Sequence, residues 1–196
     1  MGNREKVLQA ALELFNEQGT AGVTTNHIAK AAGVSPGSLY YHFKNKEAII
    51  LTLFEEMECC FDEVMEGAST TFVPSSFEDM ELYFNQISES EWKYRFFSRE
   101  TANLLQSEAL RQAFLERQAI RQAQIKGTIL GMIENRLVRP IPEERVDQLV
   151  QIIWLVSIFW NPYLVLSGQE STKERMAQSM VMVRTLVEPY LIAPQG

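Results

Sequence analysis

Residues that usually build metal sites and disulfide frameworks are scarce in this 196-residue sequence, which contains two cysteines and two histidines. Cys59 and Cys60 are adjacent and have no second pair to join, so they do not indicate a disulfide framework. Zinc would need more ligands than these residues readily supply. We therefore predict no metal site and no cofactor. The two cysteines are interpreted as small core residues, with redox sensing as the alternative.

Signals for export, membrane insertion and catalysis are also missing. The N-terminus lacks the apolar segment that signal peptides contain. The longest apolar run, 152–166, is interrupted by Ser157, Asn161 and Pro162 and is too short to span a bilayer. The sequence shows no Ser-His-Asp or Cys-His arrangement and no glycine-rich phosphate loop. We expect a cytoplasmic protein that contacts no membrane and is not an enzyme.

The sequence also lacks the alternation of apolar and polar residues that is typical of half-buried strands. Apolar residues make up 46% of the chain, which is enough for a core, and they recur at helical spacing. The sequence therefore predicts an all-α fold of about nine helices, with a loop at residues 67–75. Capping-box spacing predicts the starts of three of the later helices, at the pairs Ser76–Asp79, Ser88–Glu91 and Ser171–Glu174.

The stretch from Thr24 to Lys46 has the spacing of a helix-turn-helix. Thr24 is a suitable N-cap for a short helix, and Gly33 ends that helix because glycine adopts positive φ at little steric cost. Ser35 and Pro36 then start a second helix as its N-cap and first helical residue. The second helix of such a pair can enter the major groove of DNA. The alternative is that the pattern is only a packing motif.

The second helix carries residues that suit contact with DNA. It contains no acidic side chain to repel phosphate, and Leu39 and Phe43, four residues apart, are expected to point inward. Gly37 would let the DNA backbone come close. The candidate groups on the outward and flanking positions are Ser38, Tyr40, Tyr41 and His42.

Together with the helix before it, this region (residues 5–49) closely resembles the DNA-binding domain of the TetR family of bacterial transcriptional regulators. The matching residues are Ala11, Leu14, Phe15, Gly19, Thr24, Ile28, Ala29, Gly33, Val34, Ser35, Leu39, Tyr40, Phe43, Lys46 and Glu47. The resemblance implies DNA contacts from the start of the first motif helix, from the recognition helix and from the lysine that follows it. In this sequence these residues are Thr24, Thr25, Gly37, Ser38, Tyr40, Tyr41, His42 and Lys46.

Asn26 and His27 depart from the family pattern, in which an arginine followed by an acidic residue often stands at these positions. We therefore expect the capping box after Thr24 to be absent. Asn26 remains a candidate for contact with DNA, without the base contacts that an arginine would make.

Net charge changes sign where the motif ends. Residues 1–46 hold five lysine or arginine residues against three acidic ones, whereas residues 47–196 hold 13 against 22. An acidic remainder discourages non-specific binding of DNA by the rest of the protein. We predict a DNA-binding domain at residues 1–46 and a helical regulatory domain at residues 47–196.

The predicted regulatory domain contains an unusually aromatic segment at residues 92–97, which favours a small-molecule site. The family resemblance also implies an inducer pocket in this domain. Gly127 and Gly131 on a neighbouring helix would leave room for a ligand or for close packing. Arg99 could face an anionic group of the ligand or could be solvated. The expected ligand-binding residues are Phe61, Trp92, Phe96, Phe97, Arg99, Leu104, Ile129, Met132, Trp154 and Ile158.

The helix expected at residues 143–166 has more apolar surface than its own chain can cover. Two recognition helices about 34 Å apart would read a palindromic operator, which a single helix cannot do with useful affinity. The last two helices therefore predict a homodimer with a four-helix interface, as the resemblance also implies. The expected interface residues are Phe159, Trp160, Met176, Met180, Val183 and Val187.

Taken with the resemblance, these features predict a DNA-binding transcriptional regulator. We expect a repressor that is released from double-stranded operator DNA by an apolar or amphipathic small molecule. The alternative is a constitutive dimeric DNA-binding protein without small-molecule sensing.

Overall fold

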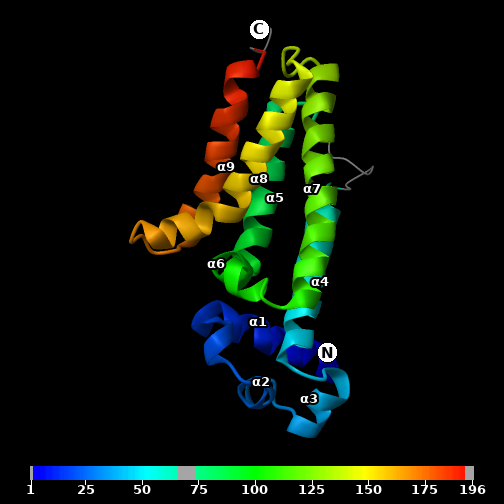
Figure 1. The fold of residues 1–196 in the computed structure, drawn as a ribbon, viewed down its shortest axis with the longest axis vertical. Helices are drawn as coiled ribbons and strands as arrows, with labels where there is room; N and C mark the ends of the chain where they lie inside the picture. Colours follow the sequence, from blue (N-terminus) through cyan, green and yellow to red (C-terminus); the bar gives the residue numbers. More distant parts are fainter. Residues whose placement is uncertain (1, 66–73, 193–196) are drawn as a thin grey trace. The chain divides into compact units, whose positions relative to one another are not determined.

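Helices make up nearly all the regular structure of the chain, as a computed structural model shows for residues 2–65 and 74–192 (Figure 1). Their bounds are α1 Asn3–Gly22, α2 Thr25–Ala31, α3 Pro36–His42, α4 Lys46–Met65, α5 Phe77–Lys93, α6 Arg95–Leu104, α7 Glu108–Glu134, α8 Glu143–Leu166, α9 Lys173–Val187 and a 3₁₀ turn at Glu188–Tyr190. Within these residues the single β-type pairing is an isolated bridge between Val138 and Leu191. The all-α prediction is confirmed. The loop predicted at residues 67–75 lies almost entirely outside the described residues.

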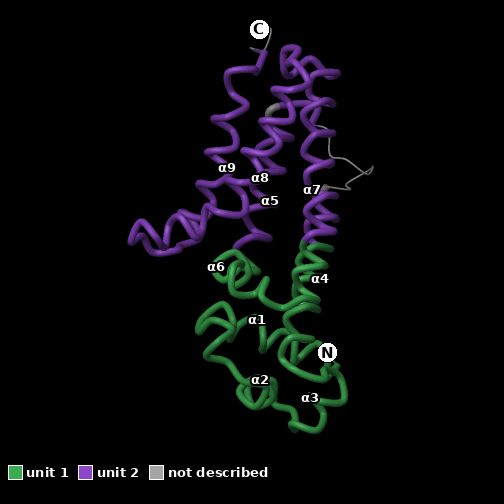
Figure 2. The backbone as a smooth tube through the Cα atoms, in the orientation of Figure 1, with its two compact units in different colours: residues 1–59, 93–114 green, residues 60–92, 115–196 purple. Residues whose placement is uncertain are grey.

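The chain divides into two compact units, which Figure 2 draws in different colours. Unit 1 comprises residues 1–59 and 93–114, and unit 2 comprises residues 60–92 and 115–196. The boundary that we predicted after residue 46 falls inside unit 1, since most of α4 and all of α6 pack with the N-terminal helices. The division passes through α4 and α7, so both units contain part of each helix.

The first motif helix, α2, begins with a reciprocal cap that we did not expect. The Thr24 hydroxyl accepts a hydrogen bond from the His27 backbone N–H at 3.2 Å, as an N-cap should. In return, the Thr24 backbone N–H donates to Nδ1 of His27 at 3.4 Å. The prediction that the capping box is absent was therefore wrong, because a neutral imidazole nitrogen accepts a hydrogen bond as a carboxylate does.

The turn between α2 and α3 follows the predicted pattern. Gly33 has φ of +66°, in the left-handed region that favours glycine. The Ser35 hydroxyl accepts from the Ser38 backbone N–H at 3.1 Å, and Pro36 is the first residue of α3. These local interactions set where the two short helices begin and end, while Ile28 and Leu39 are buried in the core of unit 1.

Two of the predicted helix starts were wrong. Ser88 lies inside α5, which continues to Lys93, because Met80, Phe84 and Ile87 keep one face packed on the core and no glycine or proline interrupts the helix. The cap of α9 is Thr172, whose hydroxyl accepts from the backbone N–H of residue 175. Ser171 instead donates its hydroxyl to the side-chain carbonyl of Asn161.

Unit 1 has an aromatic core. The rings of Phe15 and Phe96 lie 5.5 Å apart between centroids, those of Phe54 and Phe97 5.1 Å, and those of Phe97 and Phe114 6.2 Å. These pairs join α1, α4, α6 and the start of α7. Aromatic contacts of this kind add stabilisation beyond the apolar area that they bury.

Unit 2 is a helical body with an aliphatic core. This core is made of side chains of α5, α7, α8 and α9 and of the link between α7 and α8. Its buried members are Met80, Ile129, Met132, Val138, Val146, Leu149, Val150, Ile153, Met180, Val183 and Val187. All of them are apolar, so the hydrophobic effect stabilises the packing of these helices against one another.

Helix α8 carries much of its apolar surface outward. It has 24 residues and is long and apolar enough to cross a membrane by length and composition, contrary to our expectation from the interrupted run. Only 28% of its most apolar window is buried. Figure 1 shows α8 changing direction in its C-terminal half, where Pro162 stands inside the helix. The exposed side chains include Leu155, Phe159, Tyr163 and Leu166.

Gly19 interrupts α1 in a conformation that other residues avoid, with φ of +74° and ψ of 162°. A Cβ atom there would stand 2.5 Å from Oε1 of Glu100. We expect Gly19→Ala to lower the free energy of unfolding by about 1–3 kcal/mol, through backbone strain and this clash. Denaturant unfolding measures the change.

Gly22→Ala is the matched control, because a Cβ at Gly22 meets nothing within 4 Å. It should leave stability unchanged or raise it by at most about 1 kcal/mol. Equal effects of the two substitutions would contradict the strained conformation at Gly19.

Candidate functional site

Helix α3 presents a neutral aromatic surface to solvent. Leu39 and Phe43 are buried, whereas Tyr40 and Tyr41 expose 51% and 85% of their surface. Gly37 and His42 are exposed too, and Ser38 is half-buried. A helix that keeps such large side chains exposed to water has a surface available for binding.

Helices α2 and α3 are joined by side-chain hydrogen bonds. Thr25 Oγ1 lies 2.9 Å from the Tyr40 hydroxyl, which fixes the Tyr40 ring against α2. Asn3 at the start of α1 donates to the Ser38 hydroxyl at 3.0 Å. Thr24 and Asn26 at the start of α2 are exposed. The predicted DNA-contacting residues of α2 and α3 thus lie on neighbouring helices of unit 1.

Lys46 differs from the other candidates because its ammonium group already has protein partners. Its Nζ donates to the backbone carbonyls of Thr20 at 2.7 Å and of Val23 at 3.0 Å. It therefore caps the C-terminal end of α1, where carbonyl groups lack intrahelical donors. An ammonium has three donors, so one is left for a phosphate in addition to these two.

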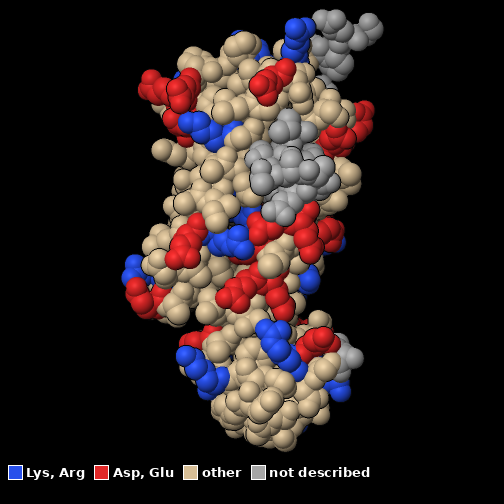
Figure 3. Space-filling model, turned by 90° about the vertical axis from the view of Figure 1, so that its right-hand side faces the viewer, with Lys and Arg blue, Asp and Glu red and all other residues tan. Residues whose placement is uncertain are grey.

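The electrostatics of this surface suit a polyanion. No acidic residue occurs from Thr24 to Asn45, and Lys30 and Lys44 are exposed there. On the face drawn in Figure 3, the end of unit 1 that carries α2 and α3 shows few red side chains. With no carboxylate to repel phosphate, exposed lysines can neutralise it and release counterions.

Helix α6 is joined to α1 by several hydrogen bonds within unit 1, all of which sequence reasoning missed. The Asn16 amide donates to the Lys93 carbonyl at 2.9 Å and accepts from the Phe96 backbone N–H at 3.0 Å. The Thr20 backbone N–H donates to the Glu100 carboxylate at 3.0 Å. Asn16 and Thr20 are each 7% exposed, and polar residues on the buried stripe of a helix are the one sequence signal that could have indicated partners here.

Arg99, which we expected either to face an anionic group of the ligand or to be solvated, also contacts α1. Its guanidinium donates to the Asn16 carbonyl at 3.1 Å, and the residue is exposed. Arg99 therefore lies on the outside of unit 1, where it donates to a backbone carbonyl of α1.

The predicted ligand-binding residues divide between the two units. Phe96, Phe97 and Leu104 are buried in unit 1, and Arg99 is on its surface. In unit 2, Ile129 and Met132 are buried in the aliphatic core. The half-buried members of the set in unit 2 are Phe61, Trp92, Trp154 and Ile158. The structure thus brings some of these residues together within each unit.

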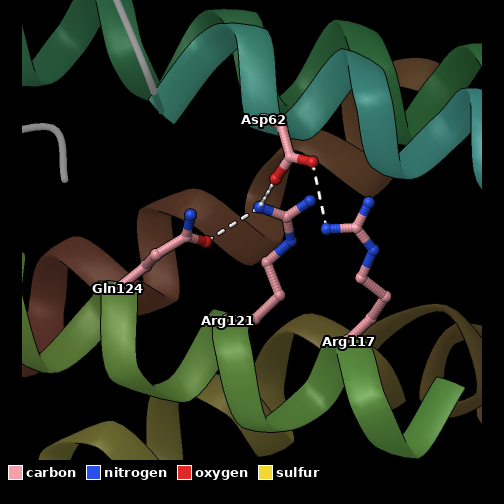
Figure 4. Close-up of polar contacts among 4 residues, drawn as sticks. All are labelled: Asp62, Arg117, Arg121 and Gln124. Carbon is pink, nitrogen blue, oxygen red and sulfur yellow. Dashed lines mark hydrogen bonds and ion pairs between the residues drawn. The ribbon is translucent and has the colours of Figure 1, made fainter. Parts of the chain in front are cut away.

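A polar cluster in unit 2 joins α4 to α7 (Figure 4). Asp62 accepts from Arg121 at 2.8 Å and from Arg117 at 3.0 Å. Arg121 also donates to the Gln124 side chain at 2.8 Å, and its guanidinium lies 5.6 Å from the centre of the Phe61 ring. Arg121 is 8% exposed, so its charge is stabilised by this carboxylate.

A buried acid marks another part of unit 2. Ser179 on α9 donates its hydroxyl to the Glu91 carboxyl on α5 at 3.3 Å. Burial raises the pKa of Glu91 to about 8, and the hydrogen bond from Ser179 acts in the opposite direction. Burial also raises the pKa of Tyr83, to about 12. From its spacing we predicted only a capping role for Glu91, which its position inside α5 excludes.

The residues that we predicted for the dimer interface differ in their exposure to solvent. Met176, Met180, Val183 and Val187 are buried within their own chain, so this stripe of α9 packs on the chain's own core. Trp160 is half-buried and donates its Nε1–H to the Arg175 carbonyl at 2.8 Å. Only Phe159 of the six is largely exposed, at 57%. The exposed apolar residues of α8 and α9 that we did not predict include Ile152, Leu155, Tyr163, Val181 and Met182.

Two family models match the chain. One, described as bacterial regulatory proteins of the tetR family, matches residues 7–53. The other, described as a bacterial transcriptional repressor, matches residues 56–195. The matched ranges cover both the helix-turn-helix and the helical body that follows it.

Curated relatives match the N-terminal region. The class C tetracycline repressor of Escherichia coli is 48% identical over 54 residues, which are 28% of this chain and 25% of that protein. The regulator AcrR of Shigella flexneri is 39% identical over 61 residues, 31% of this chain and 28% of that protein. The chain thus spans about a quarter of the length of these curated relatives.

Solved structures match the whole chain. A TetR-family transcriptional regulator from Marinobacter aquaeolei VT8 superimposes with a TM-score of 0.85 at 33% identity, over 98% of this chain and 93% of that one. A TetR transcription regulator from Haloarcula marismortui ATCC 43049 has a TM-score of 0.75 at 14% identity, over 97% and 98% of the two chains. The second likeness concerns the fold alone.

Gly37 offers a direct test of the surface of α3. A Cβ there would lie 3.9 Å from the Ser35 hydroxyl oxygen, an ordinary contact, so Gly37→Ala should leave stability unchanged or raise it by up to about 1 kcal/mol. If the DNA backbone approaches this glycine, the added methyl group should weaken operator binding by about tenfold or more. Fluorescence anisotropy with labelled DNA measures the affinity.

The control is again Gly22→Ala, which adds the same methyl group at the end of α1. Wild-type affinity in the Gly37→Ala protein would show that DNA does not come close to this part of α3.

Proposed function

Because this chain belongs to the TetR family of bacterial transcriptional regulators, we propose that it is a repressor that leaves its operator when a small apolar or amphipathic molecule binds. The observation that carries the proposal is the helix-turn-helix at residues 24–43. Its second helix exposes Tyr40 and Tyr41 beside a surface without acidic groups. The family consists of transcriptional regulators, which are not enzymes.

Repression is supported by the relatives that the N-terminal region matches. They are named as tetracycline repressors, and one from Staphylococcus aureus is named as a negative regulator of a biofilm operon. In this chain, α3 would lie in the major groove, with Thr24, Thr25 and Asn26 at the start of α2 and Lys46 at the start of α4 beside it. Base contacts would come from Ser38, Tyr40 and Asn26, and phosphate contacts from Tyr41, His42 and Lys46.

A homodimer is supported by the exposed apolar surface of α8 and α9. Leu155, Phe159 and Tyr163 on α8 are each more than half exposed, as is Val181 on α9. A second copy of the chain would cover these residues through a two-fold interface, in which the same surface of each copy meets the other. The dimer would place two recognition helices on a palindromic operator.

Sensing of a small molecule is supported by the polar groups inside unit 2. The core of a purely structural dimerisation body would gain more stability from apolar residues than from Glu91 or from the Asp62–Arg121 pair. The constitutive dimer without a sensor remains the alternative function, and a solidly packed body that responds to no compound would favour it.

Transmission to the DNA-binding helices would use the hydrogen bonds between α6 and α1 in unit 1. Asn16 accepts from the Phe96 backbone N–H at the start of α6, and the Thr20 backbone N–H donates to Glu100 in the middle of α6. The Thr20 carbonyl also accepts from Lys46. A shift of α6 would therefore displace the C-terminal end of α1, which leads directly into Thr24 and α2. The ligand would act by favouring the state of the dimer that fits DNA less well.

The proposed function is tested on the full-length chain. An operator is first selected from random double-stranded DNA, and a library of amphipathic compounds is then screened against the labelled complex. We expect at least one compound to weaken operator affinity by about 5–150-fold, the usual range of allosteric coupling. If DNA is bound and no compound changes its affinity, the constitutive alternative holds.

The dimer interface can be tested separately. Phe159→Glu places a charge on the exposed face of α8, and we expect a monomer by light scattering at micromolar concentration, together with weaker operator binding. The matched control is Leu82→Glu on α5, since Leu82 is 60% exposed and lies on another helix of unit 2. A Phe159→Glu protein that remains dimeric would refute this interface.

A further inference from the structure

Three carboxylates of α5 face α9 in unit 2, and the two on the outside are paired with cations. Glu81 receives Arg184 at 3.2 Å, and Glu89 receives Lys173 at 2.7 Å. All four side chains are about half exposed or more. Exposed pairs of this kind contribute little to stability, because water already solvates both partners.

The third carboxylate, that of Glu91, lies inside and has no cation. Among the residues that the structure describes, its one hydrogen-bond partner is the Ser179 hydroxyl at 3.3 Å, and it forms no ion pair. Ser179 is 1% exposed, and Met176 and Met180 beside it on α9 are also buried. The two exposed carboxylates thus have cationic partners within the chain, whereas the buried carboxyl of Glu91 has none.

The surroundings of Glu91 disfavour its charged form. Burial raises its pKa to about 8, so the carboxyl is largely protonated at neutral pH in the free protein. Tyr83, on the same helix, is the titratable neighbour within electrostatic reach, and it too is buried. Tyr83 also feels Arg121 on α7, whose guanidinium is engaged by Asp62 and Gln124.

We propose that Glu91 binds the positively charged nitrogen of the effector, which would be an amphipathic organic cation. This inference rests on the proposed function, because it names the class of molecule that unit 2 senses. Glu91 as a whole is half-buried, while its carboxyl lies inside beside the Ser179 hydroxyl. A cationic N–H or quaternary nitrogen would provide the opposite charge that Glu91 lacks within the chain, while apolar parts of the ligand would contact the buried side chains around it.

An anionic effector fits this part of unit 2 less well. Glu91 offers a carboxylate or phosphate no positive charge in either of its protonation states. The two guanidinium groups of the Asp62 cluster already hold a carboxylate between them, with distances of 2.8 and 3.0 Å. Binding of an anion there would require Asp62 to be displaced.

Binding of a cation at Glu91 should depend on pH, because the carboxyl must lose its proton. The free protein carries a proton on Glu91 below about pH 8, and the complex holds the ionised carboxylate beside the cation, so the proton leaves to solvent on binding. Affinity for a cation of fixed charge should therefore rise with pH, by up to about tenfold per unit below pH 8. A residue with a purely structural role would not produce this slope.

The test compares two dyes that share a ring system, rhodamine 6G as the cation and fluorescein as the anion, by fluorescence anisotropy with the full-length chain. We expect rhodamine 6G to bind more tightly, and Glu91→Gln to weaken it by about tenfold or more while leaving fluorescein unchanged. Glu89→Gln is the control, since Glu89 is exposed on the same helix and already paired. The affinity of the Glu91→Gln protein should also lose its dependence on pH between 6 and 8.

Stability provides a second measurement on the same proteins. The unfolded chain ionises Glu91 from about pH 4.5, whereas the folded chain keeps the proton up to about pH 8, so wild-type stability should fall across this interval as pH rises. Glu91→Gln should lack this component of the fall. If that variant does not fold, the pH slope of rhodamine 6G affinity in the wild type still decides the proposal.

The outcomes separate this proposal from the proposed function. Equal binding of rhodamine 6G by wild type and Glu91→Gln, a flat pH profile, or a preference for fluorescein would overturn the role of Glu91. A neutral or anionic compound that releases DNA would also overturn it while leaving the repressor proposal intact. If rhodamine 6G binds through Glu91 and operator affinity does not change, the site stands and effector-controlled repression fails.

Discussion

The amide of Asn16 is the interaction on which unit 1 depends. It donates to the carbonyl of Lys93 and accepts from the backbone N–H of Phe96, so it satisfies two peptide groups where the chain passes from α5 to α6. With those groups satisfied, Phe96 and Phe97 can enter the core beside Phe15 and Phe54. An apolar residue at position 16 would leave both peptide groups without partners in a buried place, at a cost of about 1–3 kcal/mol for each.

The helix-turn-helix could be predicted from the sequence because its determinants are local. Thr24, Gly33, Ser35 and Pro36 each act on backbone groups within a few residues, and the structure has a cap, a turn or a helix start at each of them. Even the mistaken expectation at His27 concerned which atom accepts the hydrogen bond. The position of the helix did not change.

The aromatic segment could not be placed in the same way, because its surroundings come from distant parts of the chain. Asn16 and Lys93 are 77 residues apart, and nothing in the sequence around Phe96 indicates that α1 would receive it. Periodicity has the same limit on α9. It correctly groups Met176, Met180 and Val183 on one face, but it does not say whether the chain itself or a second copy covers that face. The Asp62 cluster and the Glu91–Ser179 contact are also long-range and were missed for this reason.

The bend of α8 has a consequence for the shape of any partner. Pro162 removes a backbone donor inside the helix, and α8 changes direction in its C-terminal half, so its surface is not straight (Figure 1). A straight helix laid against this surface would touch it at one end only. A partner that covers the exposed apolar residues of α8 must therefore be curved or made of more than one segment.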